Sequence, residues 1–139
     1  MMQHITGIAR NQMVFTSLEE SISEDNPVRF IDAFVENIDL KALGFELRTP
    51  KTEGRPSFNT QIFLKIYLYG YLNGLRSSRK LEKESIRNIE LQWLLFGLTP
   101  NYHSISDFRK DNPSGLKKLF KVFVSFHRSD KFWWAHPKD

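Results

Sequence analysis

The residues best suited to chemistry lie between Gly70 and Arg87, where an apolar stretch gives way to a cationic one. Arginine and lysine recur there at intervals of three or four residues, which places them along one face of a helix. Two serines stand at the start of that helix, where backbone N–H groups are unpaired and the dipole is positive. Cations, hydroxyl groups and free N–H groups all suit phosphate oxygens. The phosphate-binding residues predicted here are Arg76, Ser77, Ser78, Arg79, Lys80, Lys83 and Arg87.

The same segment has the outline of a helix-turn-helix. Asn73 and Gly74 can end the first helix, because residues that tolerate positive φ close a helix at little cost. Ser77 or Ser78 can then cap the second helix through its side-chain oxygen. A helix, a short glycine turn and a second helix that opens with cations is the order found in DNA-binding helix-turn-helix units. Glu82 and Glu84 weaken this interpretation, since both can neutralise neighbouring cations.

A second polar surface is predicted after Pro100. Ser104 and Asp107 have the spacing of a capping box, so a helix is expected to begin at Ser104. Arg109 can read guanine in a major groove, and it can equally pair with Asp107 or with a carboxylate at the edge of the core. The residues of this second surface are Tyr102, His103, Ser104, Ser106, Arg109 and Lys110. For every cation of both surfaces, a solvated or salt-bridged side chain is the alternative to DNA contact.

Charge is distributed unevenly along the chain. The formal net charge is +4, but residues 1–53 carry five Lys/Arg against nine Asp/Glu, whereas residues 54–139 carry fifteen against seven. A basic segment with interleaved hydroxyl groups and aromatic rings suits a phosphate-backbone partner. The alternative is a solvated polar face that only confers solubility.

Most other chemistry is not expected. The chain has no cysteine, which excludes disulfides and thiolate metal sites. It lacks a glycine-rich phosphate loop, paired histidines at metal spacing and a nucleophile elbow. Asp32 and Glu36 are interpreted as a solvated helix face rather than metal ligands. No catalytic residue, metal ligand or cofactor is therefore predicted. The start lacks the features of a signal peptide, and the longest apolar stretch, Ile62 to Leu72, is too short to span a bilayer.

Periodicity and capping residues predict an all-α fold, a compact multi-helix domain. Residues 1–25 are expected to form an irregular arm, anchored by Val14, Phe15, Leu18 and Ile22. Asn26-Pro27 is a helix start, and Asn59 or Thr60 opens a helix that is apolar almost all round. The expected elements are a helix after Pro27, a turn at 40–44, a loop at 46–58, and helices from 59 or 60 to 73, 78–88, 89–96, 104–110 and after 114.

Several strings together resemble the N-terminal domain of bacterial insertion-sequence transposases of the DDE class. Their order and spacing over residues 14–128 carry the resemblance. The strings are Asn26 to Asp32, Gly54-Arg55-Pro56, Leu64 to Asn73, Arg76 to Glu82, Arg87 to Glu90, Trp93-Leu94-Leu95, Gly97 to Pro100 and Ile105 to Asn112.

The resemblance implies a helical domain that engages double-stranded DNA at the inverted-repeat ends of a transposon. In that family a following ribonuclease-H-like domain carries three acidic residues that bind two divalent metals. The segment Ser129 to Asp139 stands where its first strand is expected, and Asp130 and Asp139 lack the family motif. The expectation is a DNA-binding domain over residues 26–128, a tail outside the family over 129–139, and no catalytic domain. The expected location is the nucleoid of a bacterial cytoplasm.

Two other functions stay open. The domain can serve subunit association, with a second copy or a full-length transposase, through Trp93, Phe96 and the last Phe-rich helix. It can also be an inactive transposase remnant. DNA binding and apolar association differ in salt dependence, because only neutralised phosphates release counterions.

Overall fold

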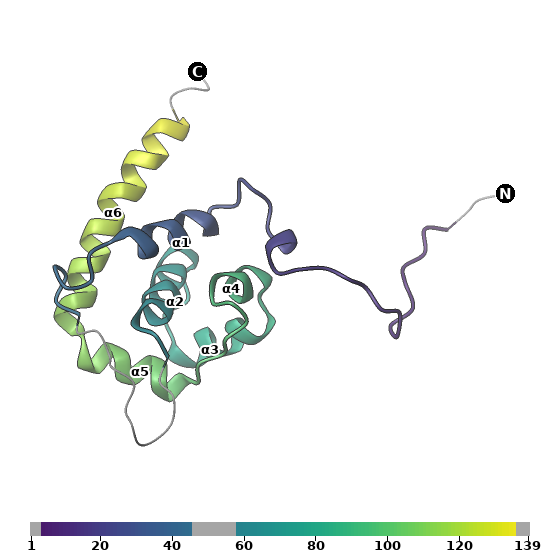
Figure 1. Cartoon of the computed structure of the whole chain (residues 1–139), viewed down its shortest axis with the longest axis horizontal. Coiled ribbons are helices and arrows are strands. Elements are labelled where there is room, and N and C mark those ends of the chain that lie inside the picture. Colours follow the sequence, from purple (N-terminus) through teal and green to yellow (C-terminus); the bar gives the residue numbers. More distant parts are fainter. Residues whose placement is uncertain (1–3, 46–57, 136–139) are drawn as a thin grey trace.

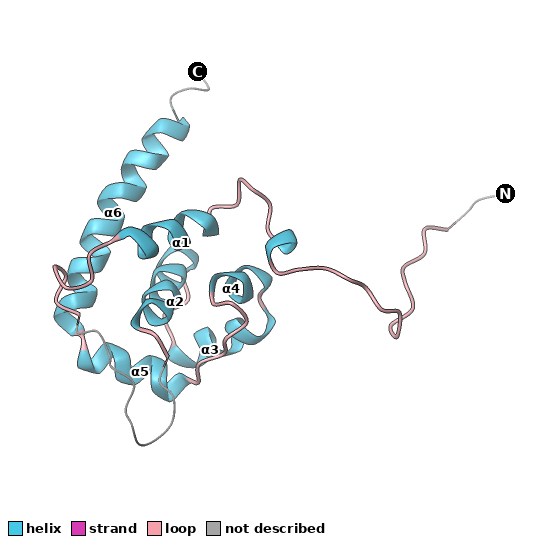
Figure 2. Ribbon diagram, viewed as in Figure 1, coloured by secondary structure: helices cyan, strands magenta, loops and turns pink. Residues whose placement is uncertain are grey.

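The structure, a computed structural model, describes residues 4–45 and 58–135. Within these residues the chain forms helices joined by turns and loops, with no strand (Figure 2). This confirms the predicted all-α fold class. Nearly all of the predicted loop at 46–58 lies outside the described residues. The elements are a 3-10 turn η1 (Glu19–Ser21) and helices α1 (Val28–Asn37), α2 (Thr60–Asn73), α3 (Ser78–Arg87), α4 (Ile89–Leu94), α5 (Tyr102–Asp111) and α6 (Pro113–Ala135).

Helix α2 is the centre of the fold. The side chain of Asn59 caps it by accepting a hydrogen bond of 2.9 Å from the backbone N–H of Gln61. Every residue from Ile62 to Gly70 is buried, as the apolar sequence predicts. Helices α1 and α4 pack against it, and the other helices surround this core (Figure 1). Because α2 is buried on all sides, its position is fixed by the surrounding helices. The turn that follows α2 then fixes where α3 begins.

Helices α1 and α6 share an aromatic contact. Asn26 accepts a hydrogen bond from the Val28 N–H, at 2.8 Å, and α1 begins at Val28, one residue after the predicted first position Pro27. Phe34 on α1 meets Phe123 on α6 edge to face, with 5.1 Å between ring centroids. Leu116, Leu119 and Phe123 form the buried stripe of α6. The helix continues to Ala135, beyond the point where the domain was expected to end.

The end of α4 and the start of α5 differ from the prediction. Helix α4 ends at Leu94 because Phe96 and Gly97 take positive φ values of 54° and 78°. Helix α5 begins at Tyr102 and not at Ser104, so the predicted capping box is wrong. The side chain of Asn101 caps α5 by accepting a 2.9 Å hydrogen bond from the Ser104 N–H. Asn101 directly follows Pro100 and is itself a favoured cap residue, so the helix begins one turn earlier and Ser104 lies inside it.

The first part of the described chain is an extended arm that points away from the helical body (Figure 1). All residues from His4 to Glu20 are exposed. Of the four predicted anchors only Ile22 is buried, and the prediction for Val14, Phe15 and Leu18 is wrong. Polar contacts hold the base of the arm instead. Glu19 accepts hydrogen bonds from Arg29 at 2.8 Å and from the Trp93 indole at 2.9 Å.

Candidate nucleic-acid interface

The turn between α2 and α3 is built by glycine. Gly74 takes the left-handed conformation with φ 72°, and the Leu75 N–H returns to the Gly70 carbonyl at 2.9 Å. Gly70 is also required by packing, since a Cβ there would lie 2.5 Å from the Leu75 carbonyl oxygen. Ser77 caps α3 by accepting a 3.3 Å hydrogen bond from the Lys80 N–H. Of the two caps predicted for α3, Ser77 is therefore the one used.

Helix α3 has one buried side and one cationic side. Leu81 and Ser85 are buried against the core. The four cations of the helix are exposed, as their spacing predicts: Arg79, Lys80, Lys83 and Arg87.

The structure joins the two surfaces that the sequence left separate. The Arg79 guanidinium lies over the Tyr102 ring at 4.2 Å from its centroid, with Nη2 3.3 Å from the hydroxyl oxygen. The Arg109 guanidinium donates to the Arg76 carbonyl at 3.4 Å. Helices α3 and α5 therefore pack side by side and present their polar residues together.

Of the two acidic residues of α3, only Glu84 forms an ion pair with a cation of the same helix. Glu82 accepts a hydrogen bond from the Tyr102 N–H at 3.3 Å. Glu84 forms an ion pair with Arg87 at 2.6 Å, and the hydrogen bond from Arg87 lowers the pKa of Glu84. On α3, on α5 and in the turn before α3, six exposed cations make no ion pair with a carboxylate of the described residues. We call them the α3–α5 cationic surface: Arg76, Arg79, Lys80, Lys83, Arg109 and Lys110.

Arg109 does not pair with Asp107. Its guanidinium lies over the Tyr67 ring, 5.2 Å from the centroid. Tyr67 is buried, donates its hydroxyl to the Ile105 carbonyl, and has a pKa raised by that burial. The aromatic ring therefore holds Arg109 at the α3–α5 contact.

The remaining predicted residues have mixed positions. His103 is exposed, and its ring centroid lies 4.1 Å from that of Tyr102. Ser78, Ser104 and Ser106 are partly buried. Charge on α5 itself is balanced, because Asp107 and Asp111 accompany Arg109 and Lys110. The positive charge of the combined surface therefore comes mainly from α3 and the turn before it.

Arg87 lies at the other end of α3, beside a polar network that was not predicted. The Tyr69 hydroxyl donates to Glu90 at 2.8 Å and accepts from Asn88 at 3.0 Å. Asn26 donates to the second oxygen of Glu90 at 2.8 Å. Burial, followed by the contact with Glu90, raises the pKa of Tyr69. Asn26 and Asn88 were identified only as helix caps, so this network depends on the tertiary structure.

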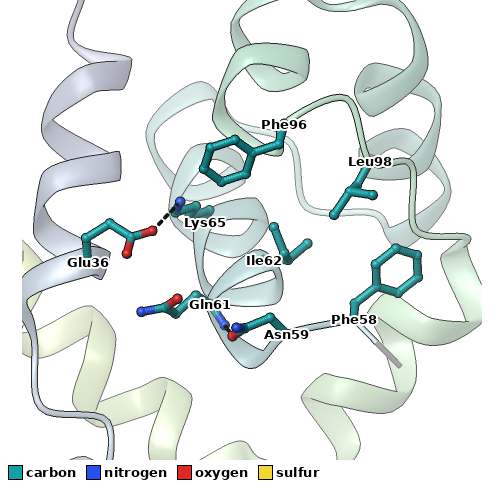
Figure 3. A pocket seen from close by; sticks show the side chains of 8 residues that line it. All are labelled: Glu36, Phe58, Asn59, Gln61, Ile62, Lys65, Phe96 and Leu98. Atoms are coloured by element: carbon teal, nitrogen blue, oxygen red, sulfur yellow. Dashed lines mark hydrogen bonds and ion pairs between the residues drawn. The ribbon is translucent and has the colours of Figure 1, made fainter. Parts of the chain in front are cut away.

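A buried lysine is the second feature that was missed. Lys65 is 0% exposed, and its Nζ lies 2.8 Å from both Asp32 and Glu36. Figure 3 shows the contact with Glu36. Both carboxylates remain at least partly exposed, as the solvated-face interpretation expects, but their pairing with a buried lysine was not predicted. The signal in the sequence was one lysine in an apolar helix and two acids four residues apart on another helix. Phe96 lies over the same Nζ, 4.8 Å from its ring centroid.

Among residues 4–45 and 58–135, no group of three or more His, Asp or Glu side chains is placed to hold a metal ion. No helix in the same residues is long and apolar enough to cross a membrane.

An all-helical domain with a cationic, aromatic-backed surface on two adjacent helices belongs among candidate nucleic-acid-binding domains. The family model described as Transposase domain (DUF772) matches residues 16–111, more than half of the chain. The protein belongs to this transposase-domain family. No curated protein and no solved structure matches the chain.

Proposed function

We propose that this chain is the DNA-binding N-terminal domain of an insertion-sequence transposase of the DDE class, and that it binds the inverted-repeat ends of the element. The observation that carries the proposal is the α3–α5 cationic surface, whose six exposed cations make no ion pair in the described chain. Membership of a transposase-domain family supports the same partner.

In this proposal α3 and the turn before it lie against the DNA backbone in a helix-turn-helix-like arrangement. Lys80 and Lys83 neutralise phosphates as flexible point charges. Arg79 is held by the Tyr102 ring, so less side-chain entropy is lost when its planar group binds phosphate or guanine. The N-terminus of α3, at Ser77 and Ser78, adds the partial positive charge of the helix dipole.

The domain contributes binding, and a separate catalytic domain contributes strand cleavage and joining with its divalent metals. The domain itself is not an enzyme and uses no cofactor in this proposal. Its place is on the nucleoid of a bacterial cytoplasm.

The test is fluorescence anisotropy with duplex DNA across a salt series, using the inverted-repeat end of a matching element and a scrambled duplex. Tight binding that prefers the repeat is expected, with a log–log salt slope of about −0.9 per phosphate contact. The Arg79→Ala/Lys80→Ala variant should lose about two units of slope, whereas Lys117→Ala/Lys118→Ala, exposed cations on α6, should lose none. A folded chain that binds neither duplex at low salt would overturn the proposal.

Subunit association is the second candidate function. Phe96 on the turn after α4 and Phe126 on α6 are both exposed apolar groups. Trp93 supports association less well, because it is engaged within the chain by Glu19 and by Arg29, whose guanidinium lies 4.9 Å from the ring centroid. Affinity between chains that is indifferent to salt would favour this role.

A further inference from the structure

The N-terminal arm carries apolar side chains that the body does not cover. Phe15 is 89% exposed, and it follows two other exposed apolar residues, Met13 and Val14. Contiguous exposed apolar groups on a monomer mark an interaction site, because water solvates them unfavourably. The further members of this set are Ile5, Ile8 and Leu18.

The body has an apolar cleft of about 440 Å³ (Figure 3), which we call the Phe96 cleft. This volume lies within the range of about 300–1,000 Å³ typical of sites that enclose ligands. Phe96 is 65% exposed and takes φ 54°, a conformation that is costly for a bulky residue and is found mostly at functional positions. The cleft is lined by Glu36, Phe58, Asn59, Gln61, Ile62, Lys65, Phe96 and Leu98.

We propose that the arm, residues 4–18, docks in the Phe96 cleft of a second copy of this chain. The proposal goes beyond DNA binding and does not rest on it. Each copy has one arm and one cleft, so two copies can exchange arms about a two-fold axis and leave neither feature uncovered.

Charge favours this occupant. Arg10 is the only Lys, Arg, Asp or Glu in residues 4–18. Glu36 and Lys65 line the cleft, and Asp32, which is not in the lining, also pairs with Lys65, so these three groups together carry a net charge of −1. The arm therefore brings one cation and several apolar groups to a site with one excess carboxylate and apolar walls.

The base of the arm favours a second copy over the chain's own cleft. Glu19 and Ile22 fix the arm at α1 and α4, and from there it extends away from the body (Figure 1). At about 3.3 Å per residue, the extended arm can span about 50 Å, which is long enough to reach the cleft of a neighbouring molecule. One cation among so many apolar groups also suits a protein surface better than a phosphate backbone.

The absence of cysteine allows a direct test by thiol crosslinking of the full chain. Phe15→Cys chains are mixed with affinity-tagged Leu98→Cys chains and treated with a short bismaleimide, which tolerates variation in register. We expect a covalent heterodimer that forms at least tenfold faster than with Ile86→Cys, a more exposed position on α3. Equal rates for the two partners would overturn the proposal. So would an internal crosslink in the Phe15→Cys/Leu98→Cys chain with none in the mixture.

A second measurement is the dimer dissociation constant from analytical ultracentrifugation without DNA. Phe15→Glu is expected to raise it at least tenfold, and the matched control Ile86→Glu, an exposed residue on α3, should leave it unchanged. An unchanged constant for Phe15→Glu together with weaker DNA binding would assign the arm to DNA and overturn the proposal. Since neither dimer assay contains DNA, failure here leaves the DNA-binding proposal standing.

Discussion

Arg79 and Arg87 lie on the same exposed side of α3, yet they differ in their partners. The Arg79 guanidinium lies over an aromatic ring and has no ion pair with a carboxylate in the described residues, whereas the Arg87 guanidinium forms an ion pair with Glu84. Both follow the same spacing of cations along α3, so only the residues that contact each side chain distinguish them. At the scale of single residues, this difference separates a candidate DNA contact from a structural cation.

The first prediction follows from that difference. Arg79→Ala should weaken binding to duplex DNA and reduce the log–log salt slope by about 0.9, because one phosphate contact is lost. Arg87→Ala should change the slope by much less, since its charge is already paired. Fluorescence anisotropy across a salt series measures both. Equal losses for the two variants would contradict the assignment.

Lys65 gives a second prediction at this scale. A fully buried ammonium without a counter-charge is costly, and each of its two carboxylates can serve alone. Asp32→Asn and Glu36→Gln should therefore each cost little, while the double variant should lose about 3 kcal/mol of unfolding free energy. Urea denaturation measures this loss.

The matched control removes the buried charge itself. Lys65→Met in the double variant should recover most of the lost stability, because no unpaired charge is then buried. If the two single changes add without coupling, the carboxylates do not share the charge as the structure indicates.

At the scale of elements, the position of α3 depends on one close approach. Gly70 lies where the helix α2 backbone meets the Leu75 carbonyl and the Leu81 side chain. Any side chain there displaces the turn and, with it, the start of α3. The turn therefore connects a packing constraint in the core to the geometry of the cationic surface.

The third prediction tests that constraint. Gly70→Ala should destabilise the fold by about 1–3 kcal/mol, because a backbone carbonyl cannot move aside as a flexible side chain can. The higher helix propensity of alanine offsets only about 1 kcal/mol of this. Gly7→Ala, where a Cβ meets nothing within 4 Å, is the control and should be neutral. Thermal unfolding distinguishes them, and a stabilised Gly70→Ala chain would show that the turn adapts.

At the scale of the whole molecule, the described carboxylates of the acidic first third form no ion pair with the α3–α5 cationic surface. The ion pairs of Glu19, Asp32 and Glu36 are with Arg29 and Lys65, on α1 and α2. The cations of the α3–α5 cationic surface take no part in them. The charge asymmetry along the sequence therefore becomes an asymmetry between surfaces.

The fourth prediction concerns the attachment of the arm to the body. The hydrogen bond from Trp93, followed by that from Arg29, lowers the pKa of Glu19 below its usual value. The contribution of Glu19 is thus present above the usual carboxyl range and is lost as pH falls through the lowered value. Trp93 fluorescence in a Trp133→Phe/Trp134→Phe chain should report this acidic transition. Glu19→Gln in the same chain should abolish it, and an unchanged transition would assign it to another group.

The sequence by itself determined the helices and most of their caps. Helix periodicity and capping are local properties, so Asn59, Ser77 and Asn88 could be read from neighbouring residues alone. The burial of α2 followed from its composition. The exposure of the α3 cations followed from their helical spacing.

Only the tertiary structure decided which residues meet across elements. It placed the Arg79 guanidinium over the Tyr102 ring and paired Arg109 with the Arg76 carbonyl instead of Asp107. It buried Lys65 beside two carboxylates. It also left Phe15 and its neighbours uncovered, although an apolar residue in a sequence is normally expected to be an anchor. Such pairings depend on distances between residues far apart in the chain. Local pattern carries no information about those distances, since they are set by how the helices pack.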